Sequence, residues 1–310
     1  MDEKLLTTEQ RNPASWKIDT KSTTEILTII NEEDKSVPQA VATAIPQIAT
    51  LVDDIVAAFV DGGRLFYIGA GTSGRLGVLD ASECPPTYGV SPDLVQGIIA
   101  GGEPALTRSI ENAEDDGNAG VQALMQAGFT KHDVLIGITA SGGAAFVLEA
   151  IKYANEIGAK VGAISCNEQT PVFDLVSASR RIYIPVGPEI ITGSTRMKSG
   201  TAQKLVLNML TTTAMIRTGK VYNNLMVNLM PVNAKLVRRA QRLISEVSGC
   251  TLDHAKQVFS ESGKETKTAM IMAMLGVDAL EARRLLTTHG GSINKVLDAC
   301  DAKRSSGEGA

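Results

Sequence analysis

Apolar positions in the first sixty residues follow the period of a helix. Residues 23–30 and 37–60 place apolar side chains three and four positions apart, and the second stretch ends at Asp61-Gly62-Gly63. We expect both stretches to be helical. The pattern predicts a helical segment over residues 1–60 that packs on the core formed by the chain after it.

From residue 64 the pattern changes to short apolar runs that alternate with helical stretches. Five runs rich in β-branched residues predict strands, at residues 64–68, 94–100, 133–138, 160–165 and 181–185. Strands of this kind are buried on both faces, so helices must cover both sides of the sheet. The predicted fold class is therefore α/β, a doubly wound parallel sheet over residues 61–248.

Beyond Lys198 the pattern is helical, and we predict no further strand there. Long segments at 199–217 and 233–247 precede three or four short amphipathic helices. The predicted breaks between these short helices lie at Gly263, Gly276 and Gly290-Gly291. We expect a small helical bundle over residues 249–300 and a flexible tail over residues 301–310.

Composition narrows the classes of partner. Thirty Lys and Arg residues against thirty-four Asp and Glu residues give a formal net charge of −4, and no basic run or basic helical face is evident. We therefore expect no nucleic-acid partner. No window holds the roughly 20 uncharged apolar residues of a membrane span, and the amino terminus is acidic and polar, unlike a secretory signal. The expected location is cytoplasmic, with no membrane partner.

Cysteine and histidine positions indicate neither a metal site nor disulfide bonds. The four cysteines lie far apart without a CxxC pair, and the three histidines form no cluster with ligand spacing. A single cysteine in an apolar stretch, such as Cys84, is most often a small buried side chain. We therefore predict no metal ligands.

Two glycine-rich loops follow predicted strands and carry hydroxyl groups at matching positions. Gly69-Ala70-Gly71-Thr72-Ser73-Gly74 follows the first strand, and Thr139-Ala140-Ser141-Gly142-Gly143 follows the third. Backbone N–H groups at a helix start, together with Ser and Thr hydroxyls, can hold a phosphate without a metal or cofactor. Both loops leave the carboxyl ends of parallel strands, so we expect them to face one crevice. The alternative is that their glycines only allow tight turns.

The first loop also matches the dinucleotide-binding pattern G-x-G-x-x-G. A dinucleotide site requires an acidic residue at the end of the next strand, but residues 94–100 run into Gly101-Gly102 instead. We therefore rank an NAD-dependent oxidoreductase third among the possible functions and predict no cofactor.

A cationic, hydroxyl-rich loop, Gly193-Ser194-Thr195-Arg196-Met197-Lys198-Ser199-Gly200-Thr201, opens the next long helix. With the preceding Gly187-Pro188-Glu189, it resembles the signature of the N-acetylmuramic acid 6-phosphate etherase family, which glucokinase regulatory proteins share. The resemblance extends to Arg11-Asn12-Pro13, to residues 31–35 and to residues 69–87, and so covers nearly the whole chain. It implies a sugar isomerase-like, flavodoxin-like sheet domain that forms a homodimer, and a ubiquitin-associated-like helical bundle after it.

The resemblance also implies a reaction. Family members remove the D-lactyl group from C3 of N-acetylmuramic acid 6-phosphate, in amino-sugar catabolism and peptidoglycan recycling. An unactivated ether resists hydrolysis, but ring opening places the C2 proton next to an aldehyde, so that a base can remove it, lactate can leave and water can add. Glu83 and Glu114 match the family's catalytic pair, and the resemblance assigns Glu83 as proton donor and Glu114 as base. Without the resemblance, Glu83 would be interpreted as a helix cap and Glu114 as part of a solvated acidic cluster.

The resemblance carries substrate-binding roles to seven residues, Thr72, Ser73, Ser141, Gly142, Ser194, Thr195 and Lys198. It departs after Gly142, where the family continues with Arg-Thr-Pro and this chain reads Gly143-Ala144-Ala145. The sequence also suggests partial burial of Glu83, which precedes Cys84-Pro85-Pro86.

A non-catalytic sugar-phosphate sensor is the second-ranked function. The glucokinase regulatory proteins that it would resemble have two sugar isomerase domains in tandem. This chain has room for one such domain and a small helical tail, and it retains both glutamates. The etherase reading therefore ranks first, with a phosphorylated amino sugar as the expected substrate.

Overall fold

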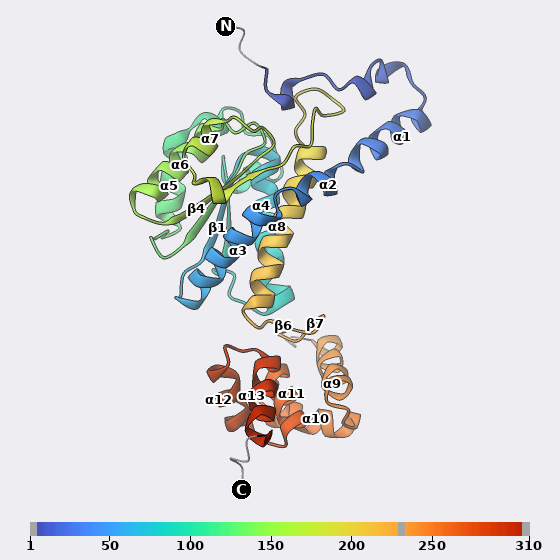
Figure 1. Ribbon diagram of the computed structural model, residues 1–310, viewed down its shortest axis with the longest axis vertical. Coiled ribbons are helices and arrows are strands. Elements are labelled where there is room, and N and C mark those ends of the chain that lie inside the picture. Colours follow the sequence, from blue (N-terminus) through green and yellow to red (C-terminus); the bar gives the residue numbers. More distant parts are fainter. Residues whose placement is uncertain (1–4, 229–232, 306–310) are drawn as a thin grey trace. The chain divides into compact units, whose positions relative to one another are not determined.

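The computed structural model of the chain describes residues 5–228 and 233–305 (Figure 1). Its contacts divide the chain into two compact units. The first comprises Met1–Ser82 and Pro92–Thr212, and the second comprises Glu83–Ser91 and Thr213–Ala310. The sheet lies in the first unit and the C-terminal helices lie in the second.

Five parallel strands form the sheet in the order β2-β1-β3-β4-β5. Their bounds are β1 (Leu65–Gly69), β2 (Val95–Ile99), β3 (Val134–Ile138), β4 (Lys160–Ser165) and β5 (Arg181–Tyr183). The order reverses between β1 and β3, since β2 lies outside β1 and β4 and β5 extend in the other direction. This arrangement is a doubly wound sheet, so the predicted fold class is confirmed, and β1 and β3 flank the switch point where such sheets bind ligands.

Helices cover both faces of the sheet (Figure 1). The helices of the first unit are α1 (Thr23–Asp34), α2 (Val37–Ala42), α3 (Ile45–Val60), α4 (Gly71–Tyr88), α5 (Gly117–Gln126), α6 (Ala145–Glu156), α7 (Pro171–Asp174) and α8 (Lys198–Arg217), of which α4 and α8 continue into the second unit. Phe66 and Ile68 of β1 share a core with α5 and α6. Tyr67, between them, points to the opposite face, where its hydroxyl donates to Asp80 of α4 at 3.1 Å.

The single helix expected over residues 37–60 is interrupted at Thr43-Ala44, which separates α2 from α3. Pro46 lies in the first turn of α3. A proline ring clashes with the carbonyl group four residues earlier and lacks the N–H that continues a helix, so the chain must restart there. The prediction of one continuous helix was wrong for this reason, while α3 still buries Leu51 and Ile55 completely.

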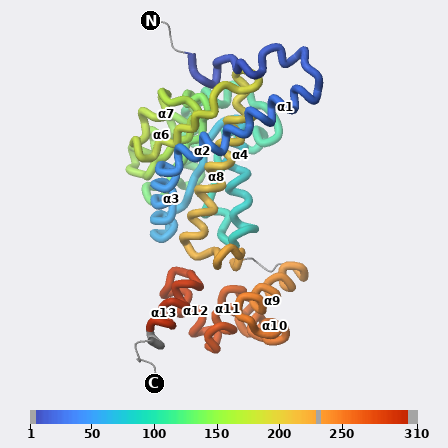
Figure 2. Tube along the Cα trace, turned by 45° about the vertical axis from the view of Figure 1, so that its right-hand side comes forward, coloured from blue at the N-terminus to red at the C-terminus, as the bar shows by residue number. Residues whose placement is uncertain are grey.

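The second unit contains a bundle of short helices with its own apolar core (Figure 2). Its helices are α9 (Ala234–Ser248), α10 (Leu252–Glu261), α11 (Thr266–Leu275), α12 (Ala279–Thr288) and α13 (Ile293–Ser305). The predicted glycine breaks fall between α10 and α13. Ala240 and Ile244 of α9 are buried in this core, so α9 belongs with the bundle, whereas the pattern places residues up to 248 with the sheet. The predicted tail is helical to Ser305, and its remainder lies outside the described residues.

A short antiparallel pair, β6 (Val221–Tyr222) and β7 (Leu225–Met226), corrects the expectation of no strand beyond Lys198. Asn223 in the turn between the two strands has a φ of 52°. Two-residue hairpin turns require such left-handed residues, and asparagine tolerates them better than most residues do. The Asn223-Asn224 pair was therefore the signal for this turn in the sequence. It was easy to overlook because each of the flanking strands is only two residues long.

Helix α9 carries a group of basic side chains that the overall composition does not indicate. Lys235, Arg238, Arg239 and Arg242 are exposed and spaced three and four residues apart, so they lie on one side of the helix. They line a groove with Leu236 and Leu243. The low overall charge of the chain concealed this local concentration.

Within the described residues, no single helix is both long and apolar enough to cross a bilayer. By length and composition alone, the bent pair Thr23–Ala42 and Ile45–Val60 meets the requirement jointly.

Lys267 of α11 gives the second unit a predictable response to alkaline pH. Its Nζ donates to the Gly219 carbonyl oxygen at 2.8 Å. Burial, and to a smaller extent the charge of Lys220, lowers the pKa of Lys267 from 10.5 to about 8. In the unfolded chain the pKa returns to its ordinary value, so the unfolded state binds more protons between these two values and stability rises with pH across that window.

We expect the free energy of unfolding of this unit to increase by about 2 kcal/mol between pH 8 and pH 10. Hydrogen exchange of the α11 amides in the full chain measures this change. Lys267→Gln, which retains a donor for Gly219 without the charge, should remove the increase; an equal increase in that variant would contradict the assignment.

Candidate active site

A cavity of about 140 Å³ lies at the switch point, between the loops after β1 and β3. It is lined by Ala70, Gly71, Thr72, Ser73, Glu114, Ile138, Thr139, Ala140, Ser141, Ala144 and Thr195. Five of the predicted site residues therefore meet here, namely Thr72, Ser73, Glu114, Ser141 and Thr195. The cavity is rich in hydroxyl groups, and Glu114 is the one ionisable residue among the described residues that line it.

The first loop turns sharply from β1 into α4. Gly71, the first residue of α4, has a φ of +53°, which residues with a side chain disfavour. The amides of Thr72 and Ser73 therefore belong to the first turn, where N–H groups have no partner within the helix. The Ser73 hydroxyl is buried and donates to Oε1 of Gln203, on α8, at 3.0 Å. This part of the loop can hold an anion through backbone N–H and hydroxyl groups.

The second loop has its shape fixed by Gly142 and Thr139. Gly142 has a φ of +86°, and a Cβ atom there would collide with the side chain of Thr170. Its amide donates to Oγ1 of Thr139 at 3.1 Å. Gly142 does not line the cavity, so its contribution is to the conformation that presents Ser141.

Asn167, which the sequence analysis did not identify, holds the second loop in place through hydrogen bonds to its backbone. Its side chain is 2% exposed, and its Nδ2 donates to the carbonyl oxygen of Ala140 at 3.2 Å and to Oγ1 of Thr8 at 3.1 Å. The Thr8 amide returns a bond to Oδ1 of Asn167 at 3.3 Å. The N-terminal segment is thereby held against the loop that carries Ser141. A polar residue two positions after β4 was the available signal.

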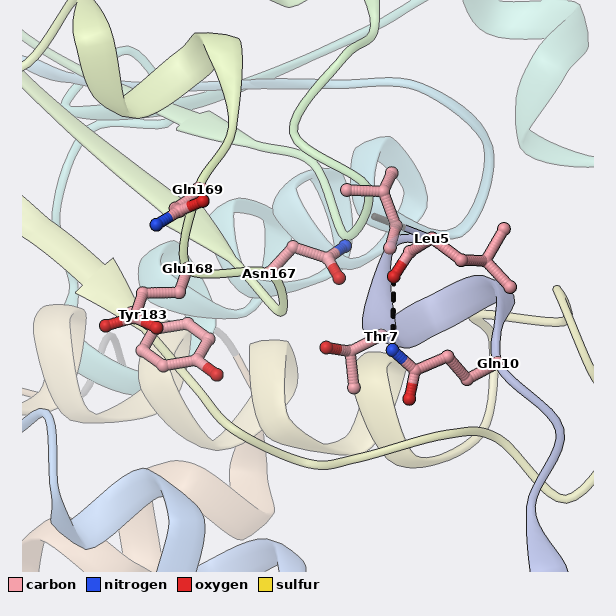
Figure 3. A pocket seen from close by; sticks show the side chains of 8 residues that line it. Leu5, Thr7, Gln10, Asn167, Glu168, Gln169 and Tyr183 are labelled. Atoms are coloured by element: carbon pink, nitrogen blue, oxygen red, sulfur yellow. Dashed lines mark hydrogen bonds between the residues drawn. The ribbon is translucent and has the colours of Figure 1, made fainter. Parts of the chain in front are cut away.

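A second pocket, also of about 140 Å³, opens beside Asn167, between the N-terminal segment and the ends of β4 and β5 (Figure 3). Its lining includes Thr7, Gln10, Glu168 and Tyr183. Burial, and then the charges of Glu168 and Cys166, raises the pKa of Tyr183 above its ordinary value. This pocket contains none of the predicted site residues.

Glu114 lies between two cavities. It is exposed in a short 3-10 turn, Ala113–Asp115, and lines both the switch-point cavity and an adjoining one of about 260 Å³. Arg75 and Arg108 line the adjoining cavity. The Arg75 guanidinium donates to the carbonyl oxygens of Leu106 and Arg108, at 3.2 and 2.9 Å, and so fixes the segment that precedes Glu114. The sequence analysis did not identify either arginine.

Glu83 does not line either cavity. Ser82, the residue before it, lies eleven residues after Gly71 in α4, or about 16 Å along the helix axis. The Glu83 side chain is exposed, which corrects the expectation of partial burial. The helix continues to Tyr88, with Pro85 and Pro86 inside it.

Ser194 and Lys198 also lie outside the lining of the cavities. Lys198 is 2% exposed, and its Nζ donates to Oε2 of Glu33 at 2.8 Å, an oxygen that also accepts from Asn12 at 2.7 Å. Burial raises the pKa of Glu33, but the bonds from Lys198 and Asn12 outweigh it and hold that pKa below its ordinary value. The ammonium of Lys198 is therefore occupied within the fold.

Glu189 occupies the N-terminus of α8. Its fully buried carboxylate accepts from the amides of Lys198 and Ser199, at 3.0 and 2.9 Å. Negative charge is stabilised at this end of a helix, and these two N–H groups would otherwise lack partners. The Gly-Pro-Glu motif thus caps the helix internally, and these two amides are not available to a phosphate.

The Gly143-Ala144-Ala145 segment forms the start of α6. Ala144 is the N-cap residue, with φ −61° and ψ 114°, and no side chain caps the helix there. An added Cβ at Gly143 meets no atom within 4 Å. Ala145 is at the first helical position, where proline is common. The Arg-Thr-Pro of the family would fit this backbone.

Ala144→Thr should therefore stabilise the chain by about 1 kcal/mol, because a threonine hydroxyl at an N-cap accepts from an amide of the first turn. The unfolding free energy in urea measures the change. Ala144→Val has the same shape without the hydroxyl and should give no gain; equal gains in both variants would point to packing instead.

Two family models match the chain, one for the glucokinase regulatory protein N-terminal SIS domain over residues 47–155 and one for the SIS domain over residues 118–213. Among solved structures, a phosphoheptose isomerase from Francisella tularensis is 18% identical, with a TM-score of 0.48, over 63% of this chain and 98% of that chain.

Curated relatives match over almost the full length. The chain is 52% identical over 297 residues to the N-acetylmuramic acid 6-phosphate etherase of Aliivibrio fischeri (strain MJ11). The aligned region covers 96% of this chain and 98% of that protein. It is also 52% identical to the enzyme of the same name from Photorhabdus laumondii, over 95% of this chain and 97% of that protein. At this identity and coverage, the chain belongs to the N-acetylmuramic acid 6-phosphate etherase family.

Proposed function

We infer that this chain cleaves the D-lactyl ether of N-acetylmuramic acid 6-phosphate, giving N-acetylglucosamine 6-phosphate and D-lactate. The observation that carries this function is the full-length identity of 52% to an etherase. The cavity fits it, since hydroxyls and helix-start amides suit a sugar phosphate and Glu114 supplies a carboxylate beside them. The reaction belongs to amino-sugar catabolism and peptidoglycan recycling.

We propose that Thr72, Ser73, Ser141 and Thr195 bind the substrate, with the phosphate at the start of α4. Glu114 then acts as base at C2 of the open-chain sugar. Removal of this proton leaves an enolate, from which the C3–O bond breaks as an acid protonates the departing lactate oxygen. Water adds to the resulting double bond at C3, and the proton returns to C2. The chemistry requires two carboxyl groups in different protonation states near adjacent carbons.

We propose that the active form is a homodimer in which Glu83 of a second copy provides the acid. The acid and base act on neighbouring atoms, yet the residue before Glu83 lies about 16 Å along α4 from the loop that lines the cavity. Glu83 is exposed and so is available to another subunit. We also propose that the protein is cytoplasmic, because its proposed substrate, a charged sugar phosphate, is retained in that compartment.

The test is release of D-lactate from N-acetylmuramic acid 6-phosphate in D2O. Elimination followed by addition places one deuterium at C2 of the N-acetylglucosamine 6-phosphate, detectable by mass spectrometry and NMR. Lactate release without deuterium at C2 would refute the route through an enolate. Binding of the sugar phosphate without lactate would favour the sensor, which no particular feature of the site supports.

A further inference from the structure

We propose that Gln203 is a positioning residue, which turns the Ser73 hydroxyl so that its proton points to the substrate phosphate. The proposal rests on the proposed function, since it concerns the phosphate site of the same cavity. Gln203 does not line that cavity, so it acts only through Ser73.

Gln203 is fully buried, and its amide has one partner. Its Oε1 accepts from the Ser73 hydroxyl at 3.0 Å, while its Nε2 has no hydrogen-bond partner. A buried N–H donor without an acceptor is costly and rare. Gln203 therefore carries a buried donor without an acceptor, and the other atom of the same amide group bonds to Ser73, which lines the cavity.

A half-turn of the Gln203 amide about its Cγ–Cδ bond exchanges nitrogen and oxygen at almost no steric cost, because the two ends of the group have nearly the same shape. Nε2 then donates to Oγ of Ser73 across the same 3.0 Å separation. The carbonyl oxygen takes the position without a partner, and an unpaired carbonyl is tolerated better than an unpaired N–H.

The half-turn changes what Ser73 can offer to a ligand. A hydroxyl has one proton and two lone pairs, so Ser73 cannot donate to a phosphate while it donates to Gln203. Once Nε2 donates to the hydroxyl oxygen, the proton is free for the cavity. A phosphate accepts hydrogen bonds only, so it selects the turned amide. Phosphate binding and the orientation of Gln203 are thereby coupled.

Gln203→Met removes the amide but keeps a similar length. Binding of N-acetylglucosamine 6-phosphate, measured by calorimetry on the full chain, should weaken about fivefold, because the Ser73 hydroxyl keeps its proton but loses the Nε2 donor that holds this proton toward the phosphate. Binding of unphosphorylated N-acetylglucosamine should change less than about twofold. Thermal stability should change little, since the variant removes the unpaired Nε2 but also takes away the acceptor of the Ser73 hydroxyl. The same substitution at the exposed Gln126 of α5 is the matched control.

A double-mutant cycle with Ser73→Ala separates positioning from packing. If Gln203 acts through Ser73, then Gln203→Met should have almost no further effect on phosphate-ligand binding in the Ser73→Ala chain. Additive losses, or equal losses for the two sugars, would overturn the proposal. Because these measurements use a product ligand, they remain decisive even if the parent chain releases no lactate, a result that would refute the proposed function alone.

Discussion

Glu83→Gln and Glu114→Gln should each reduce D-lactate release by about 10³-fold, while a mixture of the two variants should recover activity. Loss of one acid–base group commonly costs 10²- to 10⁴-fold in rate. Recovery follows from the proposal that each cavity uses Glu114 of one copy and Glu83 of the other. In a mixed dimer, one site then has both glutamates and the other has neither.

Co-expression with two different affinity tags allows the mixed dimer to be isolated. It should show about half of the parent activity, because one of two symmetry-related sites is intact. Mixed dimers of the same single variant with two tags are the control and should stay inactive. If the Glu83→Gln/Glu114→Gln mixed dimer is also inactive, the active site does not combine Glu114 of one copy with Glu83 of the other, and the proposal is wrong. Full turnover in either single variant would remove that glutamate from the mechanism.

The sheet could be predicted because the relevant signals are local. Each strand is a short apolar run, and each glycine loop directly follows its strand, so spacing along the chain defines both. The interruption at Pro46 was equally local but was outweighed by a long apolar pattern. The continuation of α4 could not be read in this way. The Gly89 amide bonds to the Pro85 carbonyl at 2.9 Å, closing a last helical turn beyond the two prolines.

The site was only partly predictable, because partners far apart in the sequence decide which polar groups remain available. Lys198 and Glu33 are 165 positions apart, and no spacing rule connects them. The loop carrying Lys198 is rich in groups that suit an anion, yet the anions that it holds are Glu33 and Glu189 of the same chain. Gln203 was hidden for a similar reason, since its partner Ser73 is 130 positions away.

The motifs that carry the family resemblance are therefore partly one internal network. Asn12 donates to Glu33 and to the Pro188 carbonyl oxygen, Glu33 pairs with Lys198, and the Lys198 amide bonds to Glu189. Four separate segments meet at the start of α8. This arrangement explains why a distinctive sequence signature can hold the loop before α8 in place without each of its residues touching the substrate.

Lys198→Met should consequently be a stability variant rather than a binding variant. The Lys198 side chain is 3% exposed and that of Glu33 is 26% exposed, so removal of the lysine leaves a partly buried carboxylate without its cation. Breaking such a pair from one side costs about 3 kcal/mol. Unfolding in urea at pH 7 measures the loss, with Lys204→Met, an exposed lysine on the same helix, as the control.

Glu33→Gln in the Lys198→Met chain should restore about 1–2 kcal/mol, because the neutral amide no longer needs the lysine. The pH dependence gives an independent check. Since the folded state holds the pKa of Glu33 below its ordinary 4.5, the stabilisation from this pair is present above that pH and is lost as the pH falls through the lower, folded value. Lys198→Met should lack this acid-dependent component. A normal unfolding free energy combined with much weaker phosphate binding would instead return Lys198 to the substrate site.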